Sequence, residues 1–218
     1  MPEAVVFDMD GVIVDTEQYW IEEEWDILDA ALPAGHDVEP HDITGINVHE
    51  QYELLAESHE MQIDEEEYFD RFDQVAERVY ERADPMPGLH DLLSWLGSRG
   101  IPLGLCTSSY PRWIEIVFET HGLHDVFDVV VSAAELDAPG KPEPDVYLEV
   151  ADRLDVAPDA MVVIEDSENG IQAAASAGAY TIAYRTDESP AMDHSRADAV
   201  VTGSADLRAH LEMVLSSE

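Results

Sequence analysis

The sequence predicts an α/β fold in which a doubly wound parallel sheet carries a smaller helical insertion after its first strand. From about residue 85 onward, short β-prone runs alternate with segments of helical periodicity, a pattern typical of parallel sheets. Between a first apolar run at residues 4–7 and this alternation lies a stretch of helical periodicity only, about residues 15–84. We therefore predict a core domain formed by residues 1–14 and 85–218, and a helical domain formed by residues 15–84.

The individual elements follow from local patterns. Residues 4–7 predict a buried strand, and residues 17–31, 48–60 and 64–82 predict helices, the third with Asp64 as its N-cap. The breaker Pro85-Met86-Pro87-Gly88 ends the insertion. Beyond it, the predicted helices are residues 88–98, 112–121, 144–154, 168–177 and 206–215, and the predicted strands are residues 101–106, 126–131, 161–164, 180–184 and 199–201.

The composition is strongly acidic but not that of a disordered chain. Hydrophobic residues make up 45% of the 218 positions, which is enough for a packed core. Asp and Glu number 49 against 10 Lys and Arg, giving a net charge of −39, and Lys141 is the only lysine. Such a surface suits molar salt, where a Debye length of about 3 Å screens self-repulsion. We interpret the chain as a protein of a halophilic cytoplasm; the alternative is an acidic mesophilic protein that binds a basic partner.

The same numbers exclude several classes of function. Nucleic-acid binding depends on cations that neutralise phosphates, so the charge argues against it. The sequence has no leader pattern and no apolar run long enough to span a bilayer. Cys106 is the only cysteine, and the histidines show no zinc-type spacing. We expect a cytoplasmic protein without nucleic-acid or membrane partners, and a monomer.

The first apolar run ends in Asp8-Met9-Asp10-Gly11, which places two carboxylates one residue apart after a strand. Two like charges this close are costly unless a cation lies between them or one of them holds a proton. Mg²⁺ is the natural cation for such oxygen ligands. One carboxylate would then serve as nucleophile and the other as proton donor. The alternative interpretation is an acidic turn after a strand.

Chemically capable residues also follow three later strands. In a doubly wound sheet, ligands bind beyond the carboxyl ends of the strands. Thr107-Ser108-Ser109 follows one strand, Lys141 lies in the loop after the next, and Glu165-Asp166-Ser167 follows a third. Each alone is an ordinary turn, helix cap or solvated side chain. Together they predict a site for phosphoryl transfer, with a metal, a cation and fixed dipoles.

These four motifs, in this order, resemble those of the haloacid dehalogenase-like (HAD) superfamily of aspartate-dependent phosphohydrolases. The phrases at residues 15–17, 141–147 and 166–171 are similar to the subgroup that contains phosphoglycolate phosphatase and beta-phosphoglucomutase. With the acidic composition, the resemblance indicates a haloarchaeal member. The insertion between the first and second motifs is similar to the small helical cap of that family, which closes over the site.

The resemblance implies a role for each core motif. Asp8 would be the nucleophile and form an aspartyl phosphate, and Asp10 would act as general acid and then general base. Lys141 would bind both the phosphate and Asp8. Mg²⁺ would be ligated by Asp8, Asp166 and the backbone carbonyl of Asp10, with Glu165 in or just behind that shell.

The resemblance also implies residues that bind the rest of the substrate. The implied phosphate ligands are Gly11, Thr107, Ser108 and Lys141, and the candidate substrate contacts of the cap are Trp20, Thr44, Gly45 and Asn47. Beta-phosphoglucomutases carry a histidine where this chain has Trp20, and they carry cations beside the glycine loop where this chain has Thr44. These differences favour a phosphatase over a mutase.

The prediction is therefore a magnesium-dependent phosphatase that hydrolyses a small phosphomonoester of the sugar phosphate or phosphoglycolate type. One alternative is a beta-phosphoglucomutase-like mutase. The other is a non-enzymatic domain that accepts a phosphoryl group, like a response-regulator receiver. Receivers also combine acids, a hydroxyl and a lysine on a doubly wound sheet, but they have no cap insertion and their motif order differs.

Overall fold

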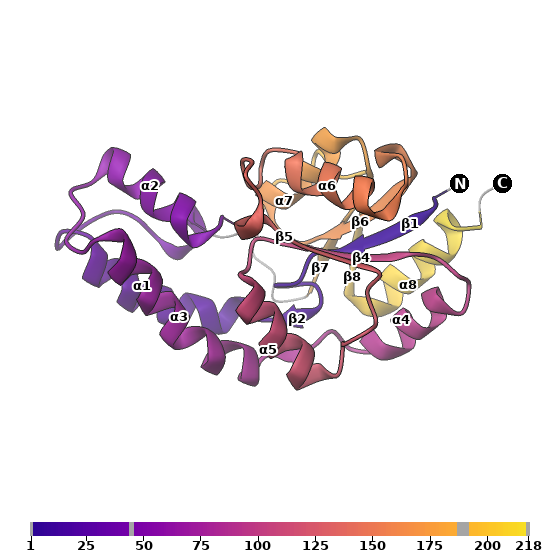
Figure 1. Cartoon of the computed structure of the whole chain (residues 1–218), viewed down its shortest axis with the longest axis horizontal. Coiled ribbons are helices and arrows are strands. Elements are labelled where there is room, and N and C mark those ends of the chain that lie inside the picture. Colours follow the sequence, from indigo (N-terminus) through magenta and orange to yellow (C-terminus); the bar gives the residue numbers. More distant parts are fainter. Residues whose placement is uncertain (1, 44–45, 187–191, 217–218) are drawn as a thin grey trace.

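The computed structural model describes residues 2–43, 46–186 and 192–216, and its core is a parallel sheet between two layers of helices (Figure 1). Neighbouring strands are parallel throughout, in the order β5-β4-β1-β6-β7-β8. Their bounds are β1 (Ala4–Phe7), β4 (Leu103–Thr107), β5 (Val129–Ser132), β6 (Met161–Glu165), β7 (Tyr180–Arg185) and β8 (Ala199–Thr202). The predicted doubly wound α/β fold is confirmed.

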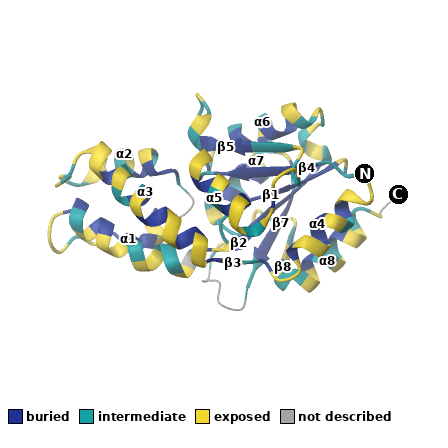
Figure 2. Cartoon of the chain, turned by 60° about the horizontal axis from the view of Figure 1, so that its bottom comes forward, coloured by how far each residue is buried: buried dark blue, intermediate teal, exposed yellow. Residues whose placement is uncertain are grey.

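Alternate residues of β1 belong to different layers, because successive side chains of a strand point to opposite faces. Val5 and Phe7 join the core cluster that includes residues of α4, α5 and α8, whereas Ala4 and Val6 join the cluster that includes residues of α6 and α7. These helices are α4 (Leu89–Gly97), α5 (Pro111–His121), α6 (Asp145–Leu154), α7 (Glu168–Ala177) and α8 (Gly203–Val214). The sheet is thus buried on both faces, as Figure 2 shows.

Three helices lie beside the sheet, at the end of the molecule away from the two termini (Figure 1). They are α1 (Glu17–Ala31), α2 (Val48–Ser58) and α3 (Glu65–Arg82). The predicted N-cap of the third helix is confirmed, because Asp64 Oδ1 accepts a hydrogen bond from the Glu67 N–H at 2.9 Å. An antiparallel pair of two-residue strands, β2 (Val14–Asp15) and β3 (Asp84–Pro85), joins these helices to the core.

Most predicted elements are confirmed, and the differences lie at their ends. The strand predicted over residues 126–131 begins only at Val129, because Val126 closes a turn through its N–H bond to the Leu123 carbonyl. The second helix of the insertion ends at Ser58, since His59 is extended. Short 3₁₀ helices that were not predicted occupy Pro40–Asp42, Ala133–Glu135 and Pro158–Ala160. Within the described ranges, each helix is too short or too polar to cross a bilayer.

Candidate active site

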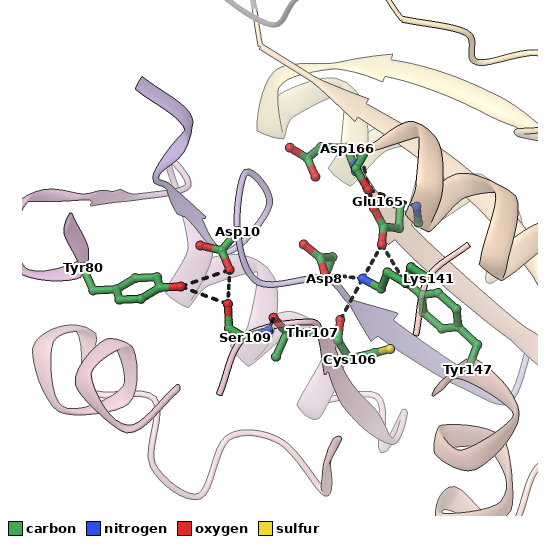
Figure 3. A network of polar contacts seen from close by, with 12 residues as sticks. Asp8, Asp10, Tyr80, Cys106, Thr107, Ser109, Lys141, Tyr147, Glu165 and Asp166 are labelled. Atoms are coloured by element: carbon green, nitrogen blue, oxygen red, sulfur yellow. Dashed lines mark hydrogen bonds and ion pairs between the residues drawn. The ribbon is translucent and has the colours of Figure 1, made fainter. Parts of the chain in front are cut away.

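Lys141 lies between two buried carboxylates at the carboxyl end of the sheet (Figure 3). Its Nζ is 2.6 Å from Asp8 Oδ1 and 2.6 Å from Glu165 Oε1. Burial acts to lower the pKa of Lys141, but the two carboxylates outweigh it and hold that pKa well above its usual value. Burial raises the pKa of Asp8 to about 8, although Lys141 opposes the rise. One lysine is thus paired with two carboxylates, so negative charges outnumber positive ones in this group of residues.

Glu165 is fully buried and is held by five hydrogen bonds. Its Oε1 accepts from Lys141 and from Tyr147 Oη, the latter at 2.7 Å. Its Oε2 accepts from the Asp166 N–H and from both the N–H and the hydroxyl of Ser167. A Cβ at Gly170 would overlap the Glu165 carboxylate, so the first turn of α7 needs glycine there. Glu165 therefore fixes the lysine and the loop that carries Asp166.

The carboxylates of Asp8, Glu165 and Asp166 form a group suited to a hard cation. One oxygen from each lies within 4.8 Å of the others. The turn after β1 comes so close that a Cβ at Gly11, where φ is +76°, would overlap the Asp166 carboxylate. Carboxylate oxygens are the ligands that Mg²⁺ prefers, and the excess of negative charge favours it. The donor set therefore fits Mg²⁺.

Asp10 faces a different set of neighbours, on the insertion side of the site (Figure 3). Its Oδ1 accepts from Thr16 Oγ1 at 2.8 Å, and its Oδ2 accepts from Ser109 Oγ at 2.7 Å and from Tyr80 Oη at 3.3 Å. Tyr80 and Ser109 also bond to each other at 2.9 Å. Burial raises the pKa of Asp10, against the opposing effect of its hydrogen bonds to Ser109, Thr16 and Tyr80. The structure thus places beside Asp8 a carboxyl group that holds a proton more readily than an exposed aspartate.

The loop after β4 brings hydroxyl groups to the same edge. Thr107 is buried and lines the cavity together with Ser108 and Gly11. The Ser109 N–H donates to Thr107 Oγ1 at 3.0 Å, and Ser132 Oγ donates to the Ser109 carbonyl at 2.7 Å. These bonds fix the loop, so its hydroxyl and N–H groups are preorganised around the cavity.

A cavity of about 130 Å³ lies between the strand ends and the insertion. The core contributes the predicted residues Asp8, Asp10, Gly11, Thr107, Ser108, Lys141 and Asp166, and the insertion contributes the predicted Trp20 and Asn47. Trp20 packs against Phe72, Tyr80 and Trp113 with ring centroids 5.5–5.8 Å apart. The other two predicted substrate contacts, Thr44 and Gly45, lie outside the described residues.

Further contacts that the sequence analysis did not predict join the insertion to the core. Glu50 of α2 accepts a hydrogen bond from the Gly140 N–H at 2.9 Å, directly before Lys141. Asp73 of α3 forms an ion pair with Arg112 of α5 and accepts from Trp113 Nε1 at 3.0 Å. They join the helical segment to the core next to the cavity-lining residues Lys141 and Trp113. No local sequence signal marks them, because their partners lie far apart in the chain.

Comparison with known proteins adds an independent finding. The family model for haloacid dehalogenase-like hydrolases matches residues 2–178. The chain is 33% identical over 204 residues to the phosphorylated carbohydrates phosphatase of Thermotoga maritima, covering 91% of this chain and 94% of that protein. It is 32% identical over 223 residues to the beta-phosphoglucomutase of Bacillus subtilis, covering 96% of this chain and 93% of that protein.

Solved structures agree with this assignment. The crystal structure of beta-phosphoglucomutase from Clostridium difficile aligns with a TM-score of 0.76 at 25% identity, covering 98% of this chain and 100% of that chain. Sequence and fold thus agree over nearly the whole length, and the chain belongs to the haloacid dehalogenase-like hydrolase family.

Proposed function

We propose that the protein is a magnesium-dependent phosphatase that hydrolyses a small phosphomonoester through an aspartyl-phosphate intermediate. The observation that carries the proposal is the pairing of two differently held acids at one cavity. Asp8 lies against Lys141 and near Asp166, whereas Asp10 is held by Thr16 and Ser109 on the other side. Two acids whose environments differ are suited to nucleophilic and proton-transfer roles respectively.

In the proposed reaction, an Asp8 oxygen attacks phosphorus and the bond from phosphorus to the ester oxygen breaks. Asp10 gives its proton to that oxygen, so the alcohol leaves uncharged. Asp10 then takes a proton from a water molecule, whose oxygen attacks phosphorus and releases phosphate from Asp8. Mg²⁺ held by Asp8, Asp166 and the Asp10 carbonyl would neutralise charge on the transferring group.

The remaining predicted residues have supporting roles in this proposal. Lys141 lowers the pKa of Asp8, which favours the anionic nucleophile, and offers a charge to the phosphoryl oxygens. Thr107, Ser108 and the backbone at Gly11 would hold those oxygens, since they line the cavity beside Asp8. Glu165 lies behind the metal ligands in this proposal and positions Lys141 and the Asp166 loop, because its two oxygens already accept hydrogen bonds from them.

We also propose that residues 15–84 act as a cap on a core formed by residues 1–14 and 85–218. The Glu50 and Asp73 contacts support this role, since they join the helical segment to the core around the cavity. Trp20 and Asn47 line the cavity from the cap side, which supports their role as substrate contacts.

Removing the metal tests the proposal most directly. With p-nitrophenyl phosphate and Mg²⁺, we expect sustained release of phosphate. Excess EDTA should lower the rate by at least about 100-fold, because the charge stabilisation that the ion supplies is worth several kcal/mol. Added Mg²⁺ should restore the rate. A rate that EDTA leaves unchanged would contradict the magnesium dependence.

The same preparation tests the two alternatives. The similarity to a beta-phosphoglucomutase makes the mutase the second candidate. A mutase would convert a hexose 1-phosphate to the 6-phosphate without net release of phosphate. A phospho-accepting receiver would take up a single stable equivalent and then stop.

Charge supports a further proposal, that the protein works in the cytoplasm of a halophile. A net charge of −39 repels itself and repels a phosphate dianion in dilute buffer, and salt screens both effects. We expect the unfolding temperature and kcat/KM both to rise from dilute buffer to molar potassium chloride. Thermal unfolding and steady-state kinetics across that series provide the test, and full stability without salt would contradict the proposal.

A further inference from the structure

Charges are unevenly placed around the cavity of the proposed phosphatase. The sheet side carries Asp8, Asp10 and Asp166 with a single cation, Lys141. Among the described residues that line the insertion side, Glu24 is the only charged one. The positions outside the described ranges contain no Lys, Arg or His in the sequence. Lys141 is already paired with two carboxylates, so the described lining of the cavity offers no further cation to an anionic group of the substrate.

Glu24 occupies the cavity wall formed by α1. Thr16, the N-cap of this helix, and Trp20 and Glu24 within it are spaced four residues apart, which places them on one side, and all three line the cavity. Glu24 is 7% exposed. Burial and then the negative charge of Glu24 raise the pKa of Tyr68. The Glu24 side chain is thus held inside the protein, on the wall of the space where the alcohol part of a substrate would lie.

The surroundings of Glu24 combine apolar walls with a fixed amide. Trp20, Phe72 and Trp113 give the cavity broad aromatic surfaces. Gln51 also lines it; its Nε2 donates to the Ile46 carbonyl at 2.9 Å, and its Oε1 accepts from Tyr68 Oη at 3.2 Å. Aromatic faces beside a hydrogen-bond acceptor suit an uncharged alcohol with hydroxyl groups.

We propose that Glu24 selects the leaving alcohol: it accepts a hydrogen bond from a hydroxyl group, and it excludes phosphomonoesters that carry a second anionic group. The inference rests on the proposed phosphatase function. A hydroxyl that donates to a carboxylate forms a strong, charge-assisted bond. A second phosphate or a carboxylate would instead be desolvated next to a like charge with no cation to offset it. Sugar-type monophosphates are then substrates, whereas 2-phosphoglycolate and sugar bisphosphates are not.

The overall charge of the protein also disfavours polyanions, so the two effects must be separated. Long-range repulsion from the −39 surface is screened in molar salt, where the Debye length is about 3 Å. A buried carboxylate in contact with the substrate is screened much less. The preference that Glu24 produces should therefore persist in molar potassium chloride.

A matched pair of substrates tests the proposal in molar potassium chloride. Glycerol 3-phosphate and 3-phosphoglycerate share a three-carbon skeleton and differ by a hydroxymethyl group in place of a carboxylate. We expect wild-type kcat/KM to favour glycerol 3-phosphate by at least about tenfold, because a like charge at contact is strongly unfavourable. Glu24→Gln should raise kcat/KM for 3-phosphoglycerate and lower it for glycerol 3-phosphate. Glu22→Gln, which removes an exposed charge from the same helix, should leave the preference unchanged.

A second measurement needs no variant. The two esters can also be used as competitive inhibitors of p-nitrophenyl phosphate hydrolysis by the wild type. The inhibition constant of glycerol 3-phosphate should be lower than that of 3-phosphoglycerate, in line with the expected kcat/KM preference. Equal kcat/KM values and equal inhibition constants would overturn the inference, as would an unchanged preference in a folded Glu24→Gln variant. If the wild type hydrolyses none of the three esters, the phosphatase function itself fails.

Discussion

Replacing Lys141 by methionine is expected to abolish turnover and to lower the free energy of unfolding by about 3–5 kcal/mol, the usual cost of removing one partner from a buried ion pair. The lysine is 3% exposed, and its Nζ lies 2.6 Å from both Asp8 and Glu165. Methionine fills much of the same space but leaves two buried carboxylates without their cation. Urea unfolding in the absence of metal measures the loss.

Activity should fall for a separate reason. Lys141 is the main influence that lowers the pKa of Asp8, and with it that pKa is still raised to about 8 by burial. Without the lysine the pKa of Asp8 rises further above neutral, so a still smaller fraction of the group is ionised and able to act as nucleophile at neutral pH. Turnover of p-nitrophenyl phosphate should become undetectable, even where the variant is shown to be folded.

Two further variants identify the cause of the instability. Adding Glu165→Gln to Lys141→Met removes one of the two carboxylates that have lost their cation. The new amide can still accept a hydrogen bond from the Asp166 loop and donate one to Tyr147. We expect the free energy of unfolding of the double variant to exceed that of Lys141→Met by at least about 1 kcal/mol, because the effects of neighbouring substitutions are coupled. The double variant should remain inactive. Arg153→Met, which removes an exposed cation, should cost less than about 1 kcal/mol. A Lys141→Met protein as stable as the wild type would contradict the argument.

The convergence of Asp8, Lys141 and Asp166 could be predicted from the sequence because it depends on backbone topology. Parallel strands bring their carboxyl ends to one edge of the sheet, so Asp8 and Asp166, which directly follow strands, are expected to lie near each other, and the loop that follows β5 can bring Lys141 to the same edge. The helices and strands were predictable for a similar reason, since burial on one or both faces imposes a period of 3.6 or a continuous apolar run.

The neighbours of Asp10 could not be predicted in this way. Tyr80 and Ser109 lie 70 and 99 residues from Asp10 in the sequence, and Tyr80 reaches it from the end of α3. In the sequence Tyr80 is one more apolar position in a periodic helix. Its contact with Asp10 depends on how the insertion packs on the core, and local patterns do not contain that information.

The predicted start of one strand is wrong, because hydrophobic residues outside the sheet come directly before it. Val126 and Phe127 are apolar and contact the main core cluster, so they resemble the start of a strand. Their side chains contribute to packing from a turn, while pairing with β4 begins only at Val129.

The predicted position of Glu165 left two alternatives open, in the metal shell or behind it. Its hydrogen bonds to Lys141 and Ser167 depend on side-chain directions that spacing alone does not determine.

Asp8→Asn is the second change with a large expected effect, and it should separate catalysis from stability. An amide cannot displace an alcohol from phosphorus, so kcat for p-nitrophenyl phosphate should fall by at least about 10⁴-fold, as for the loss of other nucleophiles that act as part of a unit. The fold should persist, because asparagine has the same shape and its Oδ1 can still accept the hydrogen bond that Lys141 donates to Asp8.

Stability should change little, in contrast to the lysine variant. Burial already disfavours the charged form of Asp8, as its pKa of about 8 indicates, so a neutral side chain removes a cost as well as an attraction. We expect the free energy of unfolding to stay within about 1 kcal/mol of the wild type, inside the usual range for single substitutions. Asp91→Asn, at an exposed position of α4, is the matched control for both measurements.

Rapid quenching then tests the covalent step itself. The wild type should show a transient phosphorylated protein that decays as phosphate appears, whereas Asp8→Asn should show neither. If the variant kept a tenth of the turnover, another group, such as Asp10 or a water molecule, would have to attack phosphorus directly. The buried contact between Asp8 and Lys141 would then stabilise the fold rather than prepare a nucleophile, and the division of labour between the two acids would have to be reversed.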